Sequence, residues 1–160
     1  MDTTVPFGGT QHDQADATFR TELPADLTSA RQARSAVRKA LSAWGMDDPD
    51  GDAELLASEI IANAAEHGGP TPISLALHRH RGPGGQPQIT CEVTDTSPAL
   101  PQPRQAQPAD ERGRGLAIVT ALAADSGVRA APPGKTTWFT LALADRLDRS
   151  ARQPEPEAGA

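Results

Sequence analysis

The order of the predicted elements assigns this 160-residue chain to the α+β class, as a two-layer α/β sandwich. Short runs of alternating apolar residues indicate strands, and two longer runs with apolar residues at helical spacing follow the first strand. A third helical run precedes the last two strands. The resulting order (β, α, α, β, β, long loop, α, β, β) predicts a mixed, mainly antiparallel sheet that helices cover on one face.

The first half of the chain contains two predicted helices and the first strands. Residues 18–24 (TFRTELP) alternate in polarity, which indicates a strand. Residues 28–45 have helical spacing, and residues 48–69 form a second helix with acidic first turns and a glycine pair at the end. Residues 72–80 and 88–95 are rich in strand-forming residues, and the turn sequence RGPGGQP between them predicts a hairpin.

The second half begins with a long proline-rich stretch, residues 96–114, that has no periodic apolar pattern. A loop of this length inside a domain is typically disordered or a functional lid. Residues 115–127 (GLAIVTALAADSG) then predict a helix that opens with glycine. Residues 127–131 and 135–143 predict two final strands joined by the turn PPG.

Composition and charge narrow the functional classes. The formal net charge of -6, without any Lys/Arg-rich run, argues against binding to nucleic acid. Cys91 is the only cysteine, which excludes a disulfide framework or a thiolate metal cluster within the chain. The start of the chain lacks signal-peptide features and no apolar run has the length of a membrane span, so we expect a cytoplasmic protein without membrane contact. We expect a flexible arm (1–17), one globular domain (18–146) and a disordered tail (147–160).

Polar residues interrupt the otherwise apolar second helix. Glu59, Asn63 and either Glu66 or His67 are three or four residues apart, so they form one stripe on a helix. A solvated stripe on an amphipathic helix is the structural explanation. The functional explanation is that the Asn63 carboxamide oxygen binds Mg²⁺, which needs only one or two protein ligands beside substrate phosphates. Glu59, one turn earlier, would then orient or deprotonate an attacking hydroxyl.

An aspartate ends the predicted strand at residues 88–95. In the sequence VTDTSP, Asp95 fits an ordinary Asp/Ser/Pro turn. The alternative is a binding role, because a carboxylate only accepts hydrogen bonds and therefore selects a donor such as the exocyclic amine of adenine.

Two glycines and two arginines precede the third helix. In ERGRG, residues 111–115, the free backbone N–H groups and the dipole of the helix start would form an anion site. The glycines let a phosphate approach the backbone, and Arg112 and Arg114 add positive charge. Glycine before a helix is common, so this stretch alone is a weak indication of phosphate binding.

A second stretch, PGKTT at residues 133–137, does not meet the requirements of a P-loop. A P-loop needs a glycine five positions before Gly134, where this chain has Arg129. It also needs a following helix, whereas TTWFTLAL has the pattern of a strand. We therefore interpret PGKTT as a turn before the last strand.

The segments EIIANAAEH, VTDTSP, GRGLAIV and GKTTWF, in this order, resemble the ATP-binding Bergerat fold of the GHKL superfamily. This superfamily includes gyrase, histidine kinases, Hsp-type chaperone ATPases and mismatch-repair ATPases. Over Phe19 to Leu143 the chain is most similar to the anti-sigma-factor serine/threonine kinases. The resemblance implies that Glu59 is the catalytic base, that Asn63 is the magnesium ligand, and that Asp95 holds the adenine amino group.

The resemblance also implies that the lid and the last strand contact the nucleotide. The stretch from Gly113 to Val119 resembles the glycine-rich lid end that wraps the phosphates, and either Arg112 or Arg114 would reach the terminal phosphate. After Asp95, TSPALPQP replaces the usual glycine-containing stretch, so we expect a stiffer loop. The implied nucleotide-binding residues are Asn63, Asp95, Ser97, Arg112, Gly113, Arg114, Gly115, Leu116 and Thr136, the last of which corresponds to a threonine near the adenine.

By resemblance, the chain is an ATP-binding anti-sigma-factor regulator. It would use ATP and Mg²⁺ as a serine/threonine protein kinase that acts on an anti-anti-sigma protein of the STAS type. It would sequester a sigma factor when that antagonist is not engaged, and relatives dimerise, which allows for a homodimer. The altered lid leaves open a second hypothesis, a non-catalytic ATP-binding module that acts by partner sequestration. A free-standing ATP hydrolase is a third, weaker hypothesis.

Overall fold

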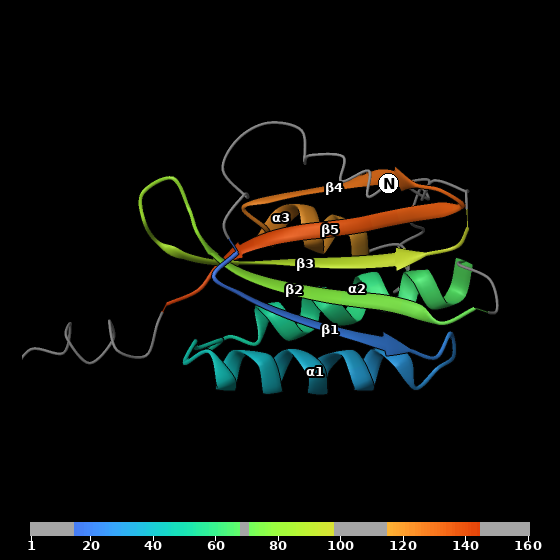
Figure 1. The fold of residues 1–160 in the computed structure, drawn as a ribbon, viewed down its shortest axis with the longest axis horizontal. Coiled ribbons are helices and arrows are strands. Elements are labelled where there is room, and N and C mark those ends of the chain that lie inside the picture. Colours follow the sequence, from blue (N-terminus) through green and yellow to red (C-terminus); the bar gives the residue numbers. More distant parts are fainter. Residues whose placement is uncertain (1–14, 68–70, 98–114, 145–160) are drawn as a thin grey trace, which may run out of the picture.

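The described part of the chain, residues 15–67, 71–97 and 115–144 of the computed structural model, folds as a sheet with helices against it (Figure 1). The element order predicted from the sequence is confirmed. The strands are β1 (Ala17–Leu23), β2 (Ile73–Arg81), β3 (Pro87–Asp95), β4 (Asp125–Ala131) and β5 (Gly134–Ala142), and the helices are α1 (Ser29–Ala43), α2 (Asp52–His67) and α3 (Gly115–Leu122).

The five strands form a single sheet in the order β1-β2-β3-β5-β4. Every neighbouring pair is antiparallel, so within the described residues the sheet is more uniform than the mixed sheet expected from the sequence. The helices lie on one face of the sheet, and α2 lies between α1 and α3 (Figure 1). The two-layer architecture is therefore confirmed, and the other face of the sheet carries no helix among the described residues.

The third helix is shorter than the sequence pattern predicted. It ends at Leu122, and β4 begins at Asp125, within the range assigned to the helix. The backbone of Asp125, Ser126 and Gly127 pairs with Thr140, Phe139 and Trp138 of β5, respectively. Asp, Ser and Gly are weak helix formers, so pairing with a neighbouring strand prevails over the local helical pattern.

Alternating residues of the strands build the core between the two layers. On β3 the buried row that faces the helices is Ile89, Cys91, Val93 and Asp95, and the row of β5 opposite it is Leu141, Phe139, Thr137 and Lys135. Apolar side chains of α1 and α2 fill the other side of this core, including Val37, Leu56, Ile60 and Ile61. Both rows have apolar residues at one end, and both have a charged residue at the edge of the sheet where β3 ends and β5 begins.

Three of the segments that carry the sequence motifs meet at one end of the sandwich (Figure 1). The C-terminal end of β3 pairs with the start of β5, and α2 ends near them, a few residues before β2 begins beside β3. Helix α3 ends close to the opposite end, where β4 starts beside the last residues of β5. Its eight residues cover only part of the length of the sheet, and its first turn is directed to the end where the other three segments lie. We call this the Asp95 end of the molecule.

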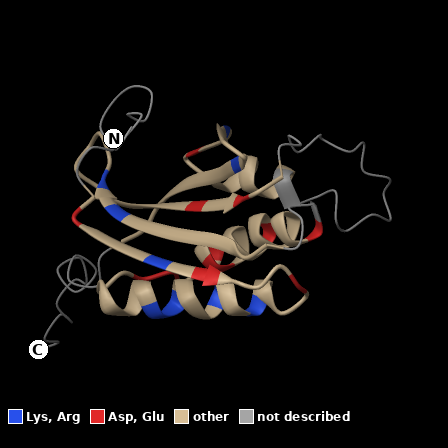
Figure 2. Cartoon of the chain, turned by 45° about the vertical axis from the view of Figure 1, so that its right-hand side comes forward, with Lys and Arg blue, Asp and Glu red and all other residues tan. Residues whose placement is uncertain are grey.

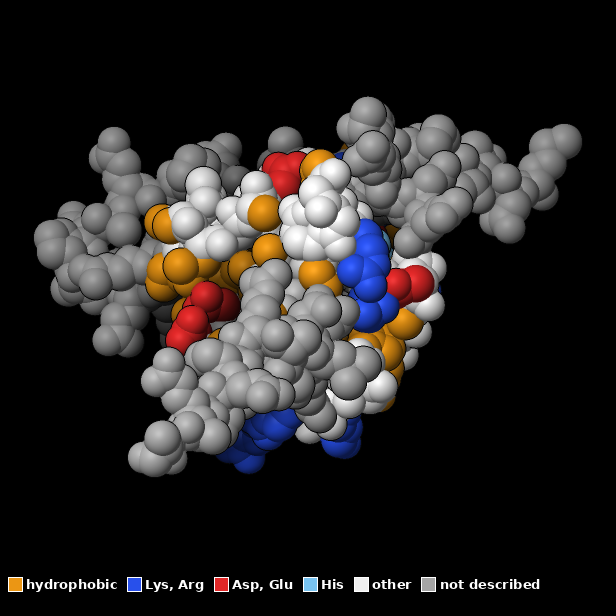
Figure 3. Space-filling model, turned by 90° about the vertical axis from the view of Figure 1, so that its left-hand side faces the viewer, with side chains coloured by type: hydrophobic (Ala, Val, Ile, Leu, Met, Phe, Trp, Pro, Cys, Tyr) orange, Lys and Arg blue, Asp and Glu red, His pale blue; other side chains and the backbone are white. Residues whose placement is uncertain are grey.

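A hollow at the opposite end is unsuited to a nucleotide. It is lined by Asp47, Asp48, Asp50 and Asp52 together with residues 141–144 of and after β5. Figure 3 looks onto this end, where acidic and hydrophobic side chains are seen together. Four carboxylates in one hollow repel a polyphosphate, so this end does not compete with the Asp95 end as a phosphate site.

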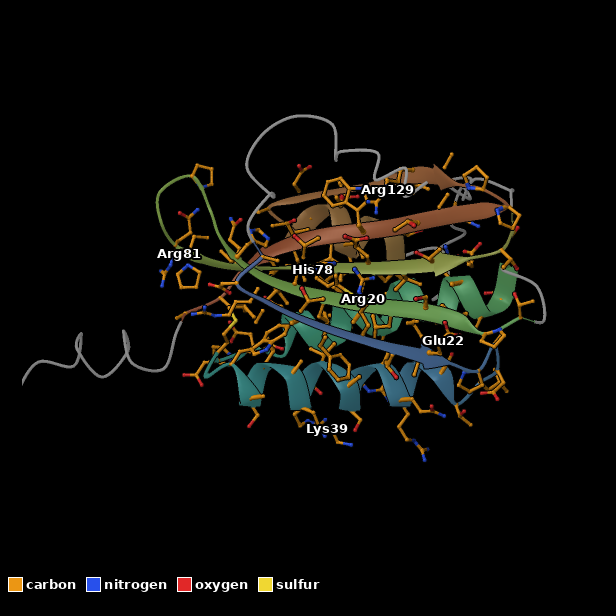
Figure 4. All side chains as sticks on the ribbon, in the orientation of Figure 1. Arg20, Glu22, Lys39, His78, Arg81 and Arg129 are labelled. Carbon is orange, nitrogen blue, oxygen red and sulfur yellow. The ribbon has the colours of Figure 1, made fainter. Side chains whose placement is uncertain are left out.

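The helix-free face of the sheet carries a polar cluster that crosses several strands (Figure 4). The Glu92 carboxylate on β3 lies 3.2 Å from Nε2 of His78 on β2 and 2.7 Å from a guanidinium nitrogen of Arg129 on β4. Burial acts to raise the pKa of Glu92, but the hydrogen bonds and charges of His78 and Arg129 outweigh it and hold this pKa below its ordinary value. The cluster therefore favours the ionised carboxylate in the folded protein.

Basic residues gather on the outer side of α1, which packs below the sheet in Figure 1, and are seen there in Figure 2. The exposed basic residues of this helix are Arg31, Arg34, Arg38 and Lys39. One of them, Arg38, forms a 2.7 Å ion pair with Glu54 of α2. Among the described residues, no helix is both long and apolar enough to cross a membrane.

Gly134 allows β5 to start close to the end of β3. A Cβ atom at Gly134 would overlap the backbone oxygen of Asp95, so no side chain can be placed there without moving the backbone. We expect Gly134→Ala to lower the free energy of unfolding by about 1–3 kcal/mol, measured by urea denaturation. In the matched control Gly84→Ala, the new Cβ meets only the flexible Gln86 side chain, and stability should barely change. Equal urea midpoints for both variants would contradict this account of Gly134.

The Glu92 cluster should make stability depend on acid. Because the folded pKa of Glu92 is lowered, its contribution is present above its unfolded pKa, about 4.5, and is lost as the pH falls through the lower folded value. Glu92→Gln should therefore reduce stability at neutral pH and also flatten the decline between about pH 5 and pH 3. Urea denaturation at several pH values measures both effects. Parallel pH profiles for the wild type and the variant would show that the cluster does not stabilise the ionised carboxylate.

Candidate functional site

The polar stripe predicted on α2 is only partly open to solvent. Glu59 and Asn63 are half-buried, while Glu66 on the same helix is exposed. Ile60 and Ile61, beside them in the sequence, are buried in the core. The helix thus fixes its backbone through apolar contacts and leaves the Glu59 carboxylate and the Asn63 carboxamide one turn apart on a partly accessible surface.

The start of α2 is held by an aspartate that precedes it. The Asp48 carboxylate accepts hydrogen bonds from the backbone N–H groups of Ala53 and Glu54, at 3.2 and 3.3 Å. These groups belong to the first turn, whose N–H groups have no partner within the helix. Capping at this end and packing along the helix therefore determine where the later residues Glu59 and Asn63 are presented.

Asp95 is a buried carboxylate that a backbone N–H group and a lysine hold in place. Its side chain is 2% exposed, and Oδ1 accepts a 2.9 Å hydrogen bond from the backbone N–H of Ser97. Lys135 Nζ lies 3.3 Å from Oδ1 and 3.2 Å from Oδ2. The carboxylate is thus held in one orientation by a backbone donor and a cation, and Ser97 reaches it through its backbone.

Lys135 and Thr137 are site residues that the sequence analysis missed. In the β3–β5 register Asp95 pairs with Lys135, and Val93 pairs with Thr137, so both side chains share the helix-facing side with Asp95. Thr136 lies on the other face, where its hydroxyl is 2.7 Å from that of Thr94. The strand alternation of PGKTT would have revealed this division, because it puts the lysine and the second threonine on one side.

The predicted lid is only partly within the described residues. Arg112, Gly113 and Arg114 lie outside them. Gly115 is the first residue of α3, and Leu116 follows it in the helix. Because α3 runs away from the Asp95 end, its first backbone N–H groups and the positive end of its dipole are directed to that end, as an anion site requires.

These residues fit a magnesium nucleotide by their chemistry. Asp95 offers a fixed hydrogen-bond acceptor, the start of α3 offers N–H donors, and Asn63 offers the kind of hard oxygen that Mg²⁺ prefers. Within the described ranges no group of three or more His, Cys, Asp or Glu residues could hold a metal by itself.

The comparison with protein families agrees with this geometry. Residues 23–141, well over half of the chain, match the model described as the histidine kinase-like ATPase domain. The matched range runs from the last residue of β1 into β5 and so includes Glu59, Asn63, Asp95 and Lys135. The chain therefore belongs to the family of histidine kinase-like ATPase domains, which is of the GHKL type.

Proposed function

We propose that this protein is an ATP-binding regulator with serine/threonine protein kinase activity. Its substrate would be a STAS-type anti-anti-sigma protein, and it would sequester a sigma factor in the cytoplasm when that antagonist is not engaged. Membership of the ATPase family supports ATP binding with Mg²⁺. The narrower assignment of kinase and partners rests on the resemblance of the whole motif set to anti-sigma-factor kinases.

The observation that carries the proposal is that the sheet, α2 and α3 each contribute a different kind of group on the helix-facing side of the sheet, toward the Asp95 end. The acceptor Asp95, the start of α3 and the polar side of α2 come from three separate parts of the chain. A nucleotide needs these three kinds of contact: an acceptor for the base, donors for the phosphates and an oxygen ligand for the metal.

Each residue has a defined task in the proposed transfer. Asn63 would hold Mg²⁺, which neutralises charge on the phosphates when it is bound. Glu59 would accept the proton of the serine or threonine hydroxyl as its oxygen bonds to the γ-phosphorus and the bond from the γ-phosphorus to the bridging oxygen breaks. The start of α3 would hold the phosphate oxygens in place, since phosphoryl transfer depends mainly on positioning and electrostatics.

A second candidate is the non-catalytic ATP-binding module that acts by partner sequestration. The observation in its favour is that the Asp95 carboxylate is held within the protein, by Lys135 and by the Ser97 backbone. A site whose base acceptor is held in place by contacts within the protein can keep its fold, and hence its partner surface, whether or not ATP is bound.

Magnesium-dependent nucleotide binding is the first test. We expect Mg-ATP to bind more tightly than ATP alone in calorimetric titrations. Asn63→Ala should weaken the binding of Mg-ATP by roughly tenfold and so remove most of this difference, because the metal loses its protein ligand. Gln32→Ala, which removes an exposed carboxamide from α1, should bind like the wild type. If Asn63→Ala retains the full magnesium effect, the assignment of the metal ligand is wrong.

Phosphoryl transfer separates the two candidate functions. With a purified STAS-type antagonist and labelled ATP, Glu59→Gln should slow phosphorylation by about 10²–10⁴-fold while calorimetric ATP binding is retained, because only proton transfer is lost. The matched control Glu66→Gln changes an exposed glutamate on the same helix and should phosphorylate normally. ATP binding without any transfer by the wild type would instead support the non-catalytic module.

A further inference from the structure

Lys135 is a buried cation to which the proposed function gives no task. Its side chain is 4% exposed and that of Asp95 is 2% exposed, and their charged atoms lie 3.2 Å apart. Both are directed to the helix layer at the Asp95 end, where the buried rows of β3 and β5 terminate. The pair thus lies within the candidate site and not on the outer surface.

Fold stability gives no clear reason for this pair. Two charges lose their hydration on burial, and replacing a buried ion pair by apolar residues of similar volume is often neutral or stabilising. The preceding positions of the same rows, such as Val93 and Phe139, are mostly apolar, so an apolar pair would continue the core. A charged pair at this place therefore calls for a role in binding.

Both members of the pair have hydrogen-bonding capacity left for a ligand. A carboxylate has about four lone-pair sites, and the described contacts of Asp95 are the Ser97 N–H and the Lys135 ammonium. An ammonium has three N–H groups. Beyond Asp95, the described contact of Lys135 is the Ser97 carbonyl oxygen at 3.5 Å, which is at the long limit for a hydrogen bond.

We propose that Lys135 is a specificity-determining residue that donates a hydrogen bond to N1 of the adenine ring, beside the bond that Asp95 accepts from the N6 amine. This inference rests on the proposed ATP-binding function. Adenine carries a donor, N6–H, and an acceptor, N1, next to each other on one edge. A carboxylate and an ammonium held side by side are complementary to that edge, whereas the carboxylate alone reads only the amine.

The pair would also discriminate more strongly than either group alone. When a site is built to make a hydrogen bond, a ligand without the matching atom leaves a buried polar group without its partner. Hydrogen bonds to charged groups are the stronger kind. A base without an acceptor at the N1 position should therefore be rejected even when it keeps the amine.

Calorimetric titration with 1-deaza-ATP, in which a C–H group replaces N1, tests the proposal. We expect the wild type to bind 1-deaza-ATP about tenfold more weakly than ATP, or weaker still. Lys135→Met should bind ATP more weakly and should no longer distinguish the two nucleotides. The matched control Arg129→Met removes an ion-paired cation from the other face of the sheet and should keep the wild-type ratio.

A second variant tests the proposal if the first variant does not fold. Lys135→Met leaves the Asp95 carboxylate buried without its cation, which is destabilising, so thermal unfolding is followed for every variant. If Lys135→Met does not fold, the double variant Lys135→Met/Asp95→Asn removes both charges, and it too should lose the distinction between ATP and 1-deaza-ATP. A double variant that keeps the wild-type ratio would overturn the proposal.

The remaining outcomes separate this inference from the function beneath it. Equal binding of ATP and 1-deaza-ATP by the wild type would overturn the role of Lys135 but leave ATP binding intact. Tighter ATP binding by Lys135→Met would also overturn it, because Lys135 would then compete with the base for Asp95. Absence of ATP binding in the wild type would refute the proposed function itself, and the assignment of Lys135 with it.

Discussion

The candidate site depends on the antiparallel register between β3 and β5. This register places Asp95 opposite Lys135 on the helix-facing side, where two buried rows of side chains end. Because side chains alternate along a strand, a slip of one residue would replace Asp95 by Thr94 on that side. The absence of a Cβ at Gly134 lets the backbones of the two strands meet at this point. Backbone pairing thus decides which charges share the buried space, and helix α2 adds its own polar groups at the same end.

Helix α2 meets two opposing demands. It must bury apolar side chains to hold the helix layer on the sheet, and it must present polar groups to a ligand. Ile60 and Ile61 meet the first demand, while Glu59 and Asn63 stay half-buried. A turn of helix supplies both because residues one position apart point in different directions. Polar residues on a helix that is anchored in this way are better positioned for chemistry than they would be on a loop.

Much of the fold followed from local patterns in the sequence. Hydrophobic periodicity correctly predicted the element order, and the same periodicity identified the spacing of Glu59 and Asn63 on one helix. It did not predict the end of α3, because Asp125 joins a strand that is stabilised by pairing with β5. Local propensity gives no information about such a partner, since the pairing exists only in the folded chain.

The contact between Lys135 and Asp95 could not be predicted in the same way. The two residues are 40 positions apart, and a lysine in a strand is ordinarily exposed. The comparison of PGKTT with the P-loop pattern concerned phosphate binding alone. It gave no information about what the lysine of this stretch contacts. The assignment of Thr136 depended on alignment by resemblance, whereas the register shows that Thr137 shares the face of Asp95.

In the proposed function, base recognition and phosphate chemistry would be carried by different layers of the fold. The Asp95–Lys135 pair is attached to two strands of the sheet, while Glu59, Asn63 and the start of α3 belong to the helix layer. Strands in the middle of a sheet are held on both sides by backbone hydrogen bonds, so the base-binding groups have little freedom to move. Helices held on a sheet by side-chain packing can shift by small amounts without breaking such bonds. If the proposed function holds, a partner protein that moves the helix layer would change phosphoryl transfer while the base stays bound.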